Sequence, residues 1–490
     1  MRLPKTFILT ILITALLSGF SFSQAQETPA DYLKPEFHQK RREALRAKLP
    51  DNSVAVFFAN PVRNRANDVD FIYHQDPNLF YLTGYKEPHA VLLVFKDKQT
   101  NPDGKSYNEI FFVQERNARA EMWTGRRLGD KGAQEKLGIL NSFNNSEFKE
   151  YDVDFTGFDK ILFYDFNNDV RDTGSPSDLF DLISQFKTKV GYDTENTTLG
   201  TEPQKNNLNV RELNSIMASL RGIKTPEELE LLRKAVFIST VGQVEVMKAM
   251  KPGLSETEIQ GIHEFVFKKY GSEYEGYPSI VGAGNNGCIL HYVENHKPHI
   301  ESKEMVLMDL GAEYHGYTAD VTRTIPVDGK FSPEEKAIYD LVYKAQEEAI
   351  QMIKPGVTFQ EIGAHAKNVI NEGLAELGII ESKDARHLYY PHGLSHHIGL
   401  DVHDLGTRGA LKENMVITVE PGIYIPSNSK CNPKWWGIAV RIEDDVLITK
   451  DGFELLSAFA PRTTEEIEKM MKQKSPLDKF DLPALKKGQE

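Results

Sequence analysis

Four acidic residues in the second half of the chain lie in segments that are otherwise apolar and β-branched: Asp309, Asp320, Glu420 and Glu443. Such segments are typical of strands, and a half-buried carboxylate there is unfavourable unless it is paired or binds a metal ion. We expect a hairpin around residues 314–316 to join the segments of Asp309 and Asp320. Each acid taken alone is better explained as a structural or solvated strand residue, so only the combination carries weight.

Histidines gather in one short segment of the same half. Five of the 14 histidines lie between His387 and His403. A lone histidine is usually an ordinary core or surface residue. A cluster in a glycine-punctuated segment with little strand character is a better ligand candidate, because imidazole commonly binds transition metals.

Four carboxylates and one histidine would neutralise two divalent cations, whereas four carboxylates converging without metal would repel one another strongly. An oxygen-dominated set with one imidazole suits Mn²⁺ best, with Co²⁺, Fe²⁺ or Zn²⁺ as alternatives. Two ions about 3.5–4 Å apart can share a hydroxide and stabilise a tetrahedral intermediate. The residues therefore indicate metal-assisted hydrolysis.

The elements that would position these residues occur twice. Residues 251–255 (KPGLS) and 354–358 (KPGVT) each precede a predicted helix, and each follows a helix that opens with Thr or Ser before Pro-Glu-Glu. Each copy leads to an apolar strand that ends in a carboxylate, Asp309 or Glu420. The spacing is too long for a solenoid. We therefore expect two α+β halves related by a pseudo-two-fold axis, with the site at their junction.

The first half of the chain predicts an α/β or α+β domain. Its strands are expected at 53–58, 90–95, 109–114 and 160–166, and its helices at 37–49 and 178–186. A boundary is expected near Gly222, just before a capping box at Thr225 that starts a new helix. The predicted division is 26–221 for the N-terminal domain, 222–472 for the catalytic domain and 473–490 for a tail.

One motif of the catalytic half suggests a different chemistry. Residues 282–287 match the dinucleotide-binding pattern G-x-G-x-x-G. That pattern needs a helix directly after it, whereas residues 288–293 predict a strand. We therefore reject dinucleotide binding.

Composition and the first residues bound the remaining possibilities. The 490 residues include 58 Lys+Arg and 71 Asp+Glu, a net charge of −13 that argues against nucleic-acid binding. Two cysteines cannot build a disulfide framework. Residues 1–25 have the charged start, the apolar run and the small residues of a cleavable signal peptide, and the run is shorter than the roughly 20 residues of a membrane span. We expect a periplasmic or secreted protein without a stable membrane anchor.

Together the motifs resemble the pita-bread metallopeptidases, and most closely the aminopeptidase P family. The matching stretches of the catalytic half are 287–292 (GCILHY), 309–326 (ending in DVTRTIP), 392–404, 419–422 (VEPG) and 441–445 (RIEDD). Residues 63–65 and 80–84 resemble the family's N-terminal domain, a creatinase-like α/β domain. The resemblance covers nearly the whole chain after the signal segment.

This resemblance implies five metal ligands: Asp309, Asp320, His396, Glu420 and Glu443. Asp320 and Glu443 would bridge two ions, and a hydroxide between the ions would attack the scissile carbonyl. Glu420 would carry the proton to the leaving nitrogen. His392 and His403 would assist catalysis. The residues implied to line the substrate pocket are His291, His392, His403 and Arg441.

The resemblance also implies the substrate, which is a peptide with proline at its second position. Prolidase, which cleaves Xaa-Pro dipeptides, shares the ligands and is the nearest alternative. A non-catalytic peptide-binding module on the same fold is a third. Relatives are commonly dimers or tetramers, so a homo-oligomer is expected by analogy.

Overall fold

Short apolar runs of the first half form a six-stranded sheet in a computed structural model that describes residues 31–101, 104–192 and 207–479. The strand order is β6-β5-β4-β1-β7-β8. Their bounds are β1 Ser53–Phe58, β4 Val91–Thr100, β5 Ser106–Val113, β6 Ser142–Asn144, β7 Lys160–Phe163 and β8 Leu208–Asn209. Central β1 pairs antiparallel with β4 and parallel with β7. This sheet confirms the α/β character predicted for the first half.

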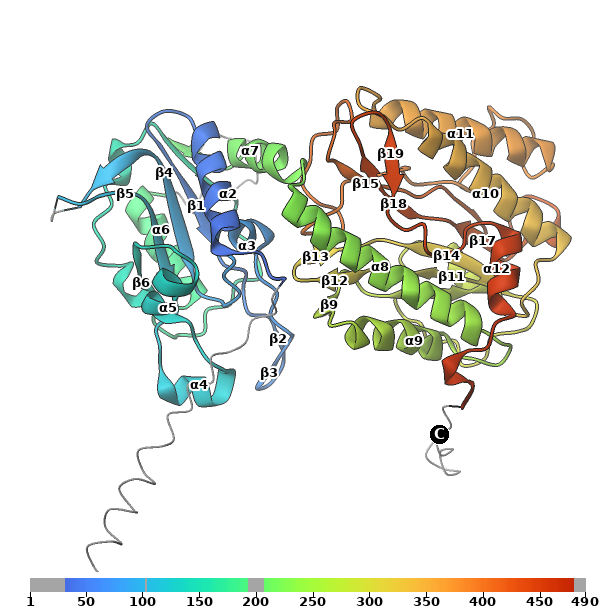
Figure 1. Ribbon diagram of the computed structural model, residues 1–490, viewed down its shortest axis with the longest axis horizontal. Helices are drawn as coiled ribbons and strands as arrows, with labels where there is room; N and C mark the ends of the chain where they lie inside the picture. The colour runs from blue at the N-terminus through green and yellow to red at the C-terminus, as the bar shows by residue number, and fades with distance from the viewer. Residues whose placement is uncertain (1–30, 102–103, 193–206, 480–490) are drawn as a thin grey trace, which may run out of the picture. The chain divides into compact units, whose positions relative to one another are not determined.

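Helices flank this sheet (Figure 1). They are α2 Pro35–Lys48, α3 Pro77–Thr83, α4 Ala118–Thr124, α5 Gly129–Lys136, α6 Leu179–Val190 and α7 Glu212–Arg221, and a small hairpin joins β2 Asn64–Ala66 to β3 Val69–Asp70. One face of β1, with Val54 and Val56, packs against Leu182 and Phe186 of α6. The predicted helices and three of the four predicted strands are confirmed. The fourth strand ends at Phe163, because the polar residues that follow favour a loop.

The helices of the second half confirm the predicted repeat. They are α8 Pro226–Ala249, α9 Glu256–Lys269, α10 Pro333–Gln351, α11 Phe359–Glu376 and a final α12 Thr464–Met471. The first four begin in the same way, with a capping box built on Thr225, Ser255, Ser332 and Thr358. Figure 1 shows α8 and α9 in green and α10 and α11 in orange, with the strands of this half between the two pairs.

The strands of the second half also occur in two corresponding sets. The first set is β9 Tyr274–Glu275, β10 Ile280–Ala283, β11 Met305–Asp309, β12 Ala312–Tyr314, β13 Tyr317–Thr318 and β14 Thr322–Pro326. The second is β15 Val416–Val419, β16 Gly422–Ile425, β17 Ile438–Arg441, β18 Asp444–Ile448 and β19 Phe453–Leu455. In the first, β11 pairs with β14, and in the second, β15 pairs with β18. Apolar residues of both sets share one core.

Two buried glutamines occupy equivalent places in the two halves. Gln243 of α8 donates from its side-chain nitrogen to the carbonyls of Met308 and Val321. Gln346 of α10 donates to the carbonyls of Val419 and Ile442. Each carbonyl belongs to a residue next to one of the four candidate carboxylates. The repeat therefore fixes the backbone at all four positions in the same way.

Two details differ from the sequence-based expectations. Asp320 lies between β13 and β14 rather than within a strand, because the hairpin β12–β13 turns back and β11 pairs with β14 instead. The prediction of a strand at 288–293 is also wrong. Its first residue ends a short 3₁₀ helix, Gly284–Cys288, and turns follow. A five-residue 3₁₀ helix is not the α-helix that dinucleotide binding requires, so the rejection stands.

Three further observations concern the predicted ends of the chain, membrane spans and cysteines. The predicted signal segment 1–25 and residues 480–490 of the predicted tail lie outside the described residues. Within the described part, no helix is long and apolar enough to span a membrane. Cys288 and Cys431 are both free thiols.

We predict that Gln346→Leu destabilises the protein, because it leaves the carbonyls of Val419 and Ile442 buried without a donor. The expected loss is about 1–3 kcal/mol for each unsatisfied group, measured as the free energy of unfolding in urea. Gln351→Leu is the matched control, since Gln351 is exposed on the same helix and surface changes usually stay within about 0.5 kcal/mol. Equal effects of the two changes would contradict the role of Gln346.

Candidate metal centre and active site

Three of the predicted ligands come together from three different segments. Asp320 precedes β14, His396 lies in the long segment between α11 and β15, and Glu443 separates β17 from β18. One ligand atom from each lies within 4.8 Å of the others. Thr418 holds the His396 backbone, because the His396 N–H donates to the Thr418 hydroxyl over 3.2 Å and the Thr418 N–H donates to the His396 carbonyl over 3.0 Å.

The other two predicted ligands lie beside this group. Glu420 directly follows β15, and its Oε1 is 3.5 Å from His396 Nε2. Asp320 Oδ2 is also 3.5 Å from His396 Nε2. Asp309 ends β11 and is joined to Asp320 through the Tyr277 hydroxyl, which lies 2.6 Å from an oxygen of each. The structure thus brings together all five residues named as ligands.

Burial and mutual repulsion govern the charges of the carboxylates. Burial, followed by the charges of the neighbouring acids, raises the pKa of Asp320 and of Glu443 well above the usual value. Burial raises the pKa of Glu420 to about 7, although His396 and Arg441 act against it. Burial also opposes ionisation of Asp309, but the Arg441 charge together with hydrogen bonds from Tyr277, Arg441 and Asp320 holds that pKa below its usual value.

These residues fit a divalent metal ion. His396 donates from Nδ1 to the His397 carbonyl over 3.0 Å, so the neutral ring presents the lone pair of Nε2 toward Asp320 and Glu420. A divalent cation would offset the burial and, at Asp320 and Glu443, the repulsion between acids that raise the pKa of these carboxyl groups. Oxygen-rich sets with one imidazole suit first-row divalent metals.

A second group of side chains orients the ligands, and of this group the sequence predicted a site role only for Arg441. Arg441 donates to Asp309 over 2.5 Å, to the Tyr424 hydroxyl over 2.9 Å and to the Thr322 hydroxyl over 3.2 Å. Thr322 in turn donates to Glu443 over 2.6 Å. The predicted contact of Arg441 with substrate stays a prediction, since its observed partners are all residues of the site. Tyr277 and Tyr424 lie outside the carboxylate and histidine patterns, so no sequence signal pointed to them.

The histidines predicted to contact substrate lie around the ligands. The His403 and His396 rings meet edge to face, with centroids 4.4 Å apart. His392 Nδ1 is 3.7 Å from Glu420 Oε2, and its Nε2 is 2.8 Å from the Tyr424 hydroxyl. Burial, followed by the Arg441 charge, lowers the pKa of His392 to about 4, so its ring is neutral at pH 7. His291 is exposed, and its charge affects the pKa of both His392 and His403.

Buried ion pairs hold the loop that carries His396 and His403. Asp404 accepts hydrogen bonds from Arg221 at the end of α7 and, over 2.9 Å, from Lys224. The Asp404 backbone N–H donates to the His397 carbonyl over 3.0 Å, which closes the loop. Gly399 packs so closely against Asp404 and Lys224 that a side chain there would overlap both. Two cations outside the loop therefore fix its conformation.

Comparison with known proteins places this site in a family. Residues 38–157 match the aminopeptidase P N-terminal domain, and residues 230–450 match metallopeptidase family M24. The Xaa-Pro aminopeptidase of Escherichia coli is 34% identical over 445 residues, which cover 88% of this chain and 97% of that protein. The chain belongs to the aminopeptidase P family. It is a metal-dependent aminopeptidase, and the resemblance seen in its motifs is confirmed.

Other members of the family agree with this assignment. The structure of E. coli aminopeptidase P with the inhibitor Pro-Leu matches with a TM-score of 0.78 and 32% identity, and the match covers 90% of this chain and 98% of that one. The mitochondrial intermediate cleaving peptidase 55 of Arabidopsis thaliana is 30% identical over 452 residues, which cover 92% of this chain and 85% of that protein. The predicted fold, an N-terminal α/β domain and a pita-bread catalytic domain, is confirmed.

We predict that Lys224→Met destabilises the protein and raises KM, because Asp404 then keeps only Arg221 and the histidine loop loosens. Removing one partner from a buried ion pair costs about 3–5 kcal/mol, which thermal unfolding will measure. Lys412→Met is the matched control, because Lys412 is an exposed lysine shortly after the histidine loop. A Lys224→Met protein as stable as this control would contradict the role given to the ion pairs.

Proposed function

We propose that the protein is an exported Xaa-Pro aminopeptidase that removes the N-terminal residue of peptides with proline at the second position. The observation that carries the proposal is the Glu420 carboxyl group, which lies 3.5 Å from His396 and beside the group of Asp320, His396 and Glu443. Relatives that align over nearly their whole length are named Xaa-Pro aminopeptidases. The N-terminal domain that aligns with theirs further supports this substrate class.

The proposed cofactor is a pair of divalent ions, with Mn²⁺ as the metal best suited to the oxygen-rich donors. Asp309, Asp320, His396, Glu420 and Glu443 would hold them. When bound, such ions supply positive charge that polarises the scissile carbonyl and favours ionisation of water. Arg441, Thr322 and Tyr277 would keep the ligand oxygens oriented through the hydrogen bonds described above.

Glu420 is proposed to move the proton. Its carboxyl group lies 3.5 Å from His396 Nε2, among the candidate ligands, where a general acid–base group can take a proton and release it. The bond before proline is a tertiary amide, whose nitrogen must gain that proton to leave. His392 is fixed by the Gly393 carbonyl and the Tyr424 hydroxyl, which suits a neutral side chain that orients the substrate.

We predict that the protein with added Mn²⁺ releases the first residue of Xaa-Pro-Xaa tripeptides. Hydrolysis is followed by the appearance of the free N-terminal amino acid. A tripeptide with alanine in place of proline controls for specificity, and an Xaa-Pro dipeptide tests the prolidase alternative. Turnover of the dipeptide alone would overturn the aminopeptidase assignment. Absence of any turnover in metal-saturated protein would favour a binding module.

We predict that Glu420→Ala lowers kcat by about 10²–10⁴-fold, the usual contribution of a general acid–base residue. The folded fraction and bound metal are measured in the same preparation by circular dichroism and atomic emission. Glu413→Ala is the matched control, because Glu413 is exposed shortly before the same strand. A kcat near that of the control protein would remove Glu420 from the mechanism.

We propose in addition that residues 1–25 are removed during export and that the mature chain begins at Gln26. The supporting features are the basic start, the apolar run and the small residues before the junction. Intact mass of the protein recovered from the periplasm or medium tests this, and a full-length mass there would contradict it. The domain limits 26–221 and 222–472, the tail 473–490 and a dimeric or tetrameric assembly belong to the same proposal.

A further inference from the structure

A cavity with unused hydrogen-bond donors lies in the N-terminal α/β part. The residues that form it are far from the candidate ligands in sequence. It has a volume of about 520 Å³. Its walls come from the segment after β1, from His89 before β4, from the stretch that follows α4, and from the loop before α6. This volume lies within the usual range of small-molecule sites, about 300–1,000 Å³.

Arg127, in the wall of this cavity, has a buried donor without an acceptor. Its Nη1 donates to the Glu115 carbonyl over 3.2 Å, while its Nε is buried and has no partner among the described residues. A buried N–H of a charged group is strongly unfavourable without an acceptor, and an unsatisfied group in a native structure points to a missing water or ion. Arg127 is therefore ready to bind an anion.

His89 adds a donor whose orientation is fixed by the backbone. Its φ is +59°, an uncommon value for a residue with a side chain. The Leu179 backbone N–H, at the start of α6, donates to His89 Nδ1 over 3.0 Å. Because Nδ1 accepts, Nε2 must carry the ring proton. Burial lowers the pKa of His89, which keeps the ring neutral and Nε2 a donor at pH 7.

The acids of the same cavity already have donors of their own. Glu87 accepts from the Leu128 backbone N–H over 2.8 Å and from the Tyr85 hydroxyl over 3.1 Å. Asp178 caps α6 and accepts from Asp181 and Thr173. Arg171 also lines the cavity and has no ion pair within the described chain. The third acid of the lining, Asp70, accepts from Asn64 over 3.0 Å.

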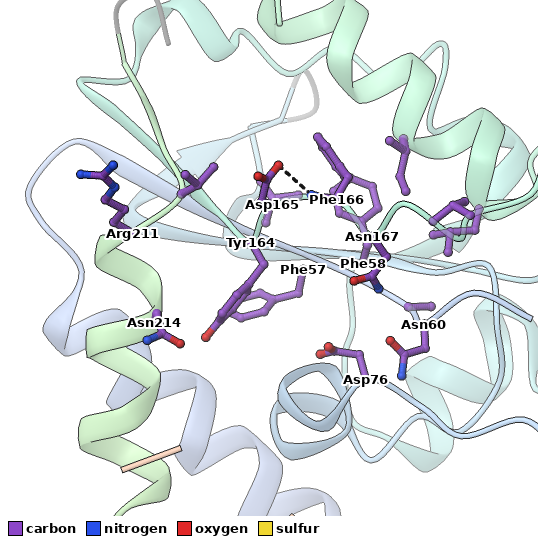
Figure 2. Close-up of a pocket in the computed structure, with 16 residues that line it drawn as sticks. Phe57, Phe58, Asn60, Asp76, Tyr164, Asp165, Phe166, Asn167, Arg211 and Asn214 are labelled. Atoms are coloured by element: carbon purple, nitrogen blue, oxygen red, sulfur yellow. Dashed lines mark hydrogen bonds between the residues drawn. The ribbon is translucent and has the colours of Figure 1, made fainter. Parts of the chain in front are cut away.

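A neighbouring cavity carries fewer cationic side chains. It has a volume of about 570 Å³, lies at the carboxyl ends of β1 and β7, and shares Val170 and Leu179 with the cavity of His89. Figure 2 shows Asp76, Asp165 and Arg211 among the side chains around it. Arg211 is the one arginine in its lining, whereas Arg126, Arg127 and Arg171 line the cavity of His89.

From these observations we propose that the cavity of Arg127, His89 and Arg171 binds an organic carboxylate with an apolar body. The Arg127 guanidinium, which lines the cavity, and Nε2 of His89 would hold the carboxylate. Pro61, Val62 and Pro88 give the cavity an apolar wall for the rest of the molecule. The proposal concerns a site separate from the candidate metal centre and does not depend on the proposed function.

The site is tested by soaking crystals of the full-length, metal-loaded protein in 4-bromobenzoate. The anomalous signal of bromine locates the ligand without assumptions. We expect a peak against the apolar wall, with the carboxylate toward Arg127 and His89. Peaks found only at the metal centre, or none at all, would overturn the proposal.

Binding in solution is followed by ¹⁹F NMR with 4-(trifluoromethyl)benzoate. Arg127→Gln is expected to weaken binding at least tenfold, whereas Arg119→Gln, an exposed arginine of α4, is the matched control and keeps wild-type binding. His89→Asn tolerates the positive φ and removes the Nε2 donor, so it tests the site even if Arg127→Gln folds poorly. Unchanged binding in His89→Asn, or displacement by an equal concentration of inorganic phosphate, would refute an organic carboxylate site.

Discussion

The candidate active site depends on one electrostatic constraint, which is the crowding of four carboxyl groups in a buried space with a single guanidinium. Arg441 bonds directly to Asp309 alone among the four, and the remaining three carboxyl groups have raised pKa values. Such a group of acids is stable only with more positive charge or with protons. A divalent cation meets the same requirement and leaves the carboxylates unprotonated. A metal ion at this place would therefore stabilise the arrangement of the four carboxyl groups.

The internal repeat explains how a chain can place four acids together at all. Each half contributes one acid at the end of a strand and a second beside the partner strand. A glutamine from the long helix then fixes the carbonyls next to both. Because these bonds involve the backbone, they hold the carboxylate positions without using the side-chain oxygens. Duplication of one arrangement thus produces a site with twice the charge of either half.

The sequence predicted the parts of this site that repeat or that carry a distinctive residue type. Capping boxes at Thr225 and Ser332, and the acids at strand ends, follow from local rules of helix starts and burial. Tyr277 and Tyr424 could not be found in this way, because a tyrosine in an apolar stretch is usually an ordinary core residue. The strand predicted after Gly287 failed for a related reason, since apolar residues there pack against neighbouring strands without joining a sheet.

The histidine loop shows why some order must come from outside a segment. Residues 387–403 contain turns and no regular strand, although backbone hydrogen bonds tie Leu394, His396 and Ile398 to β15 and the residue after it. Asp404 adds a side-chain constraint by accepting from Arg221 and Lys224, all three of them buried. A buried ion pair adds little net stability over an apolar core, but its geometry is strict. In this loop that strictness is useful, because a small shift of His396 would separate it from Asp320 and Glu420.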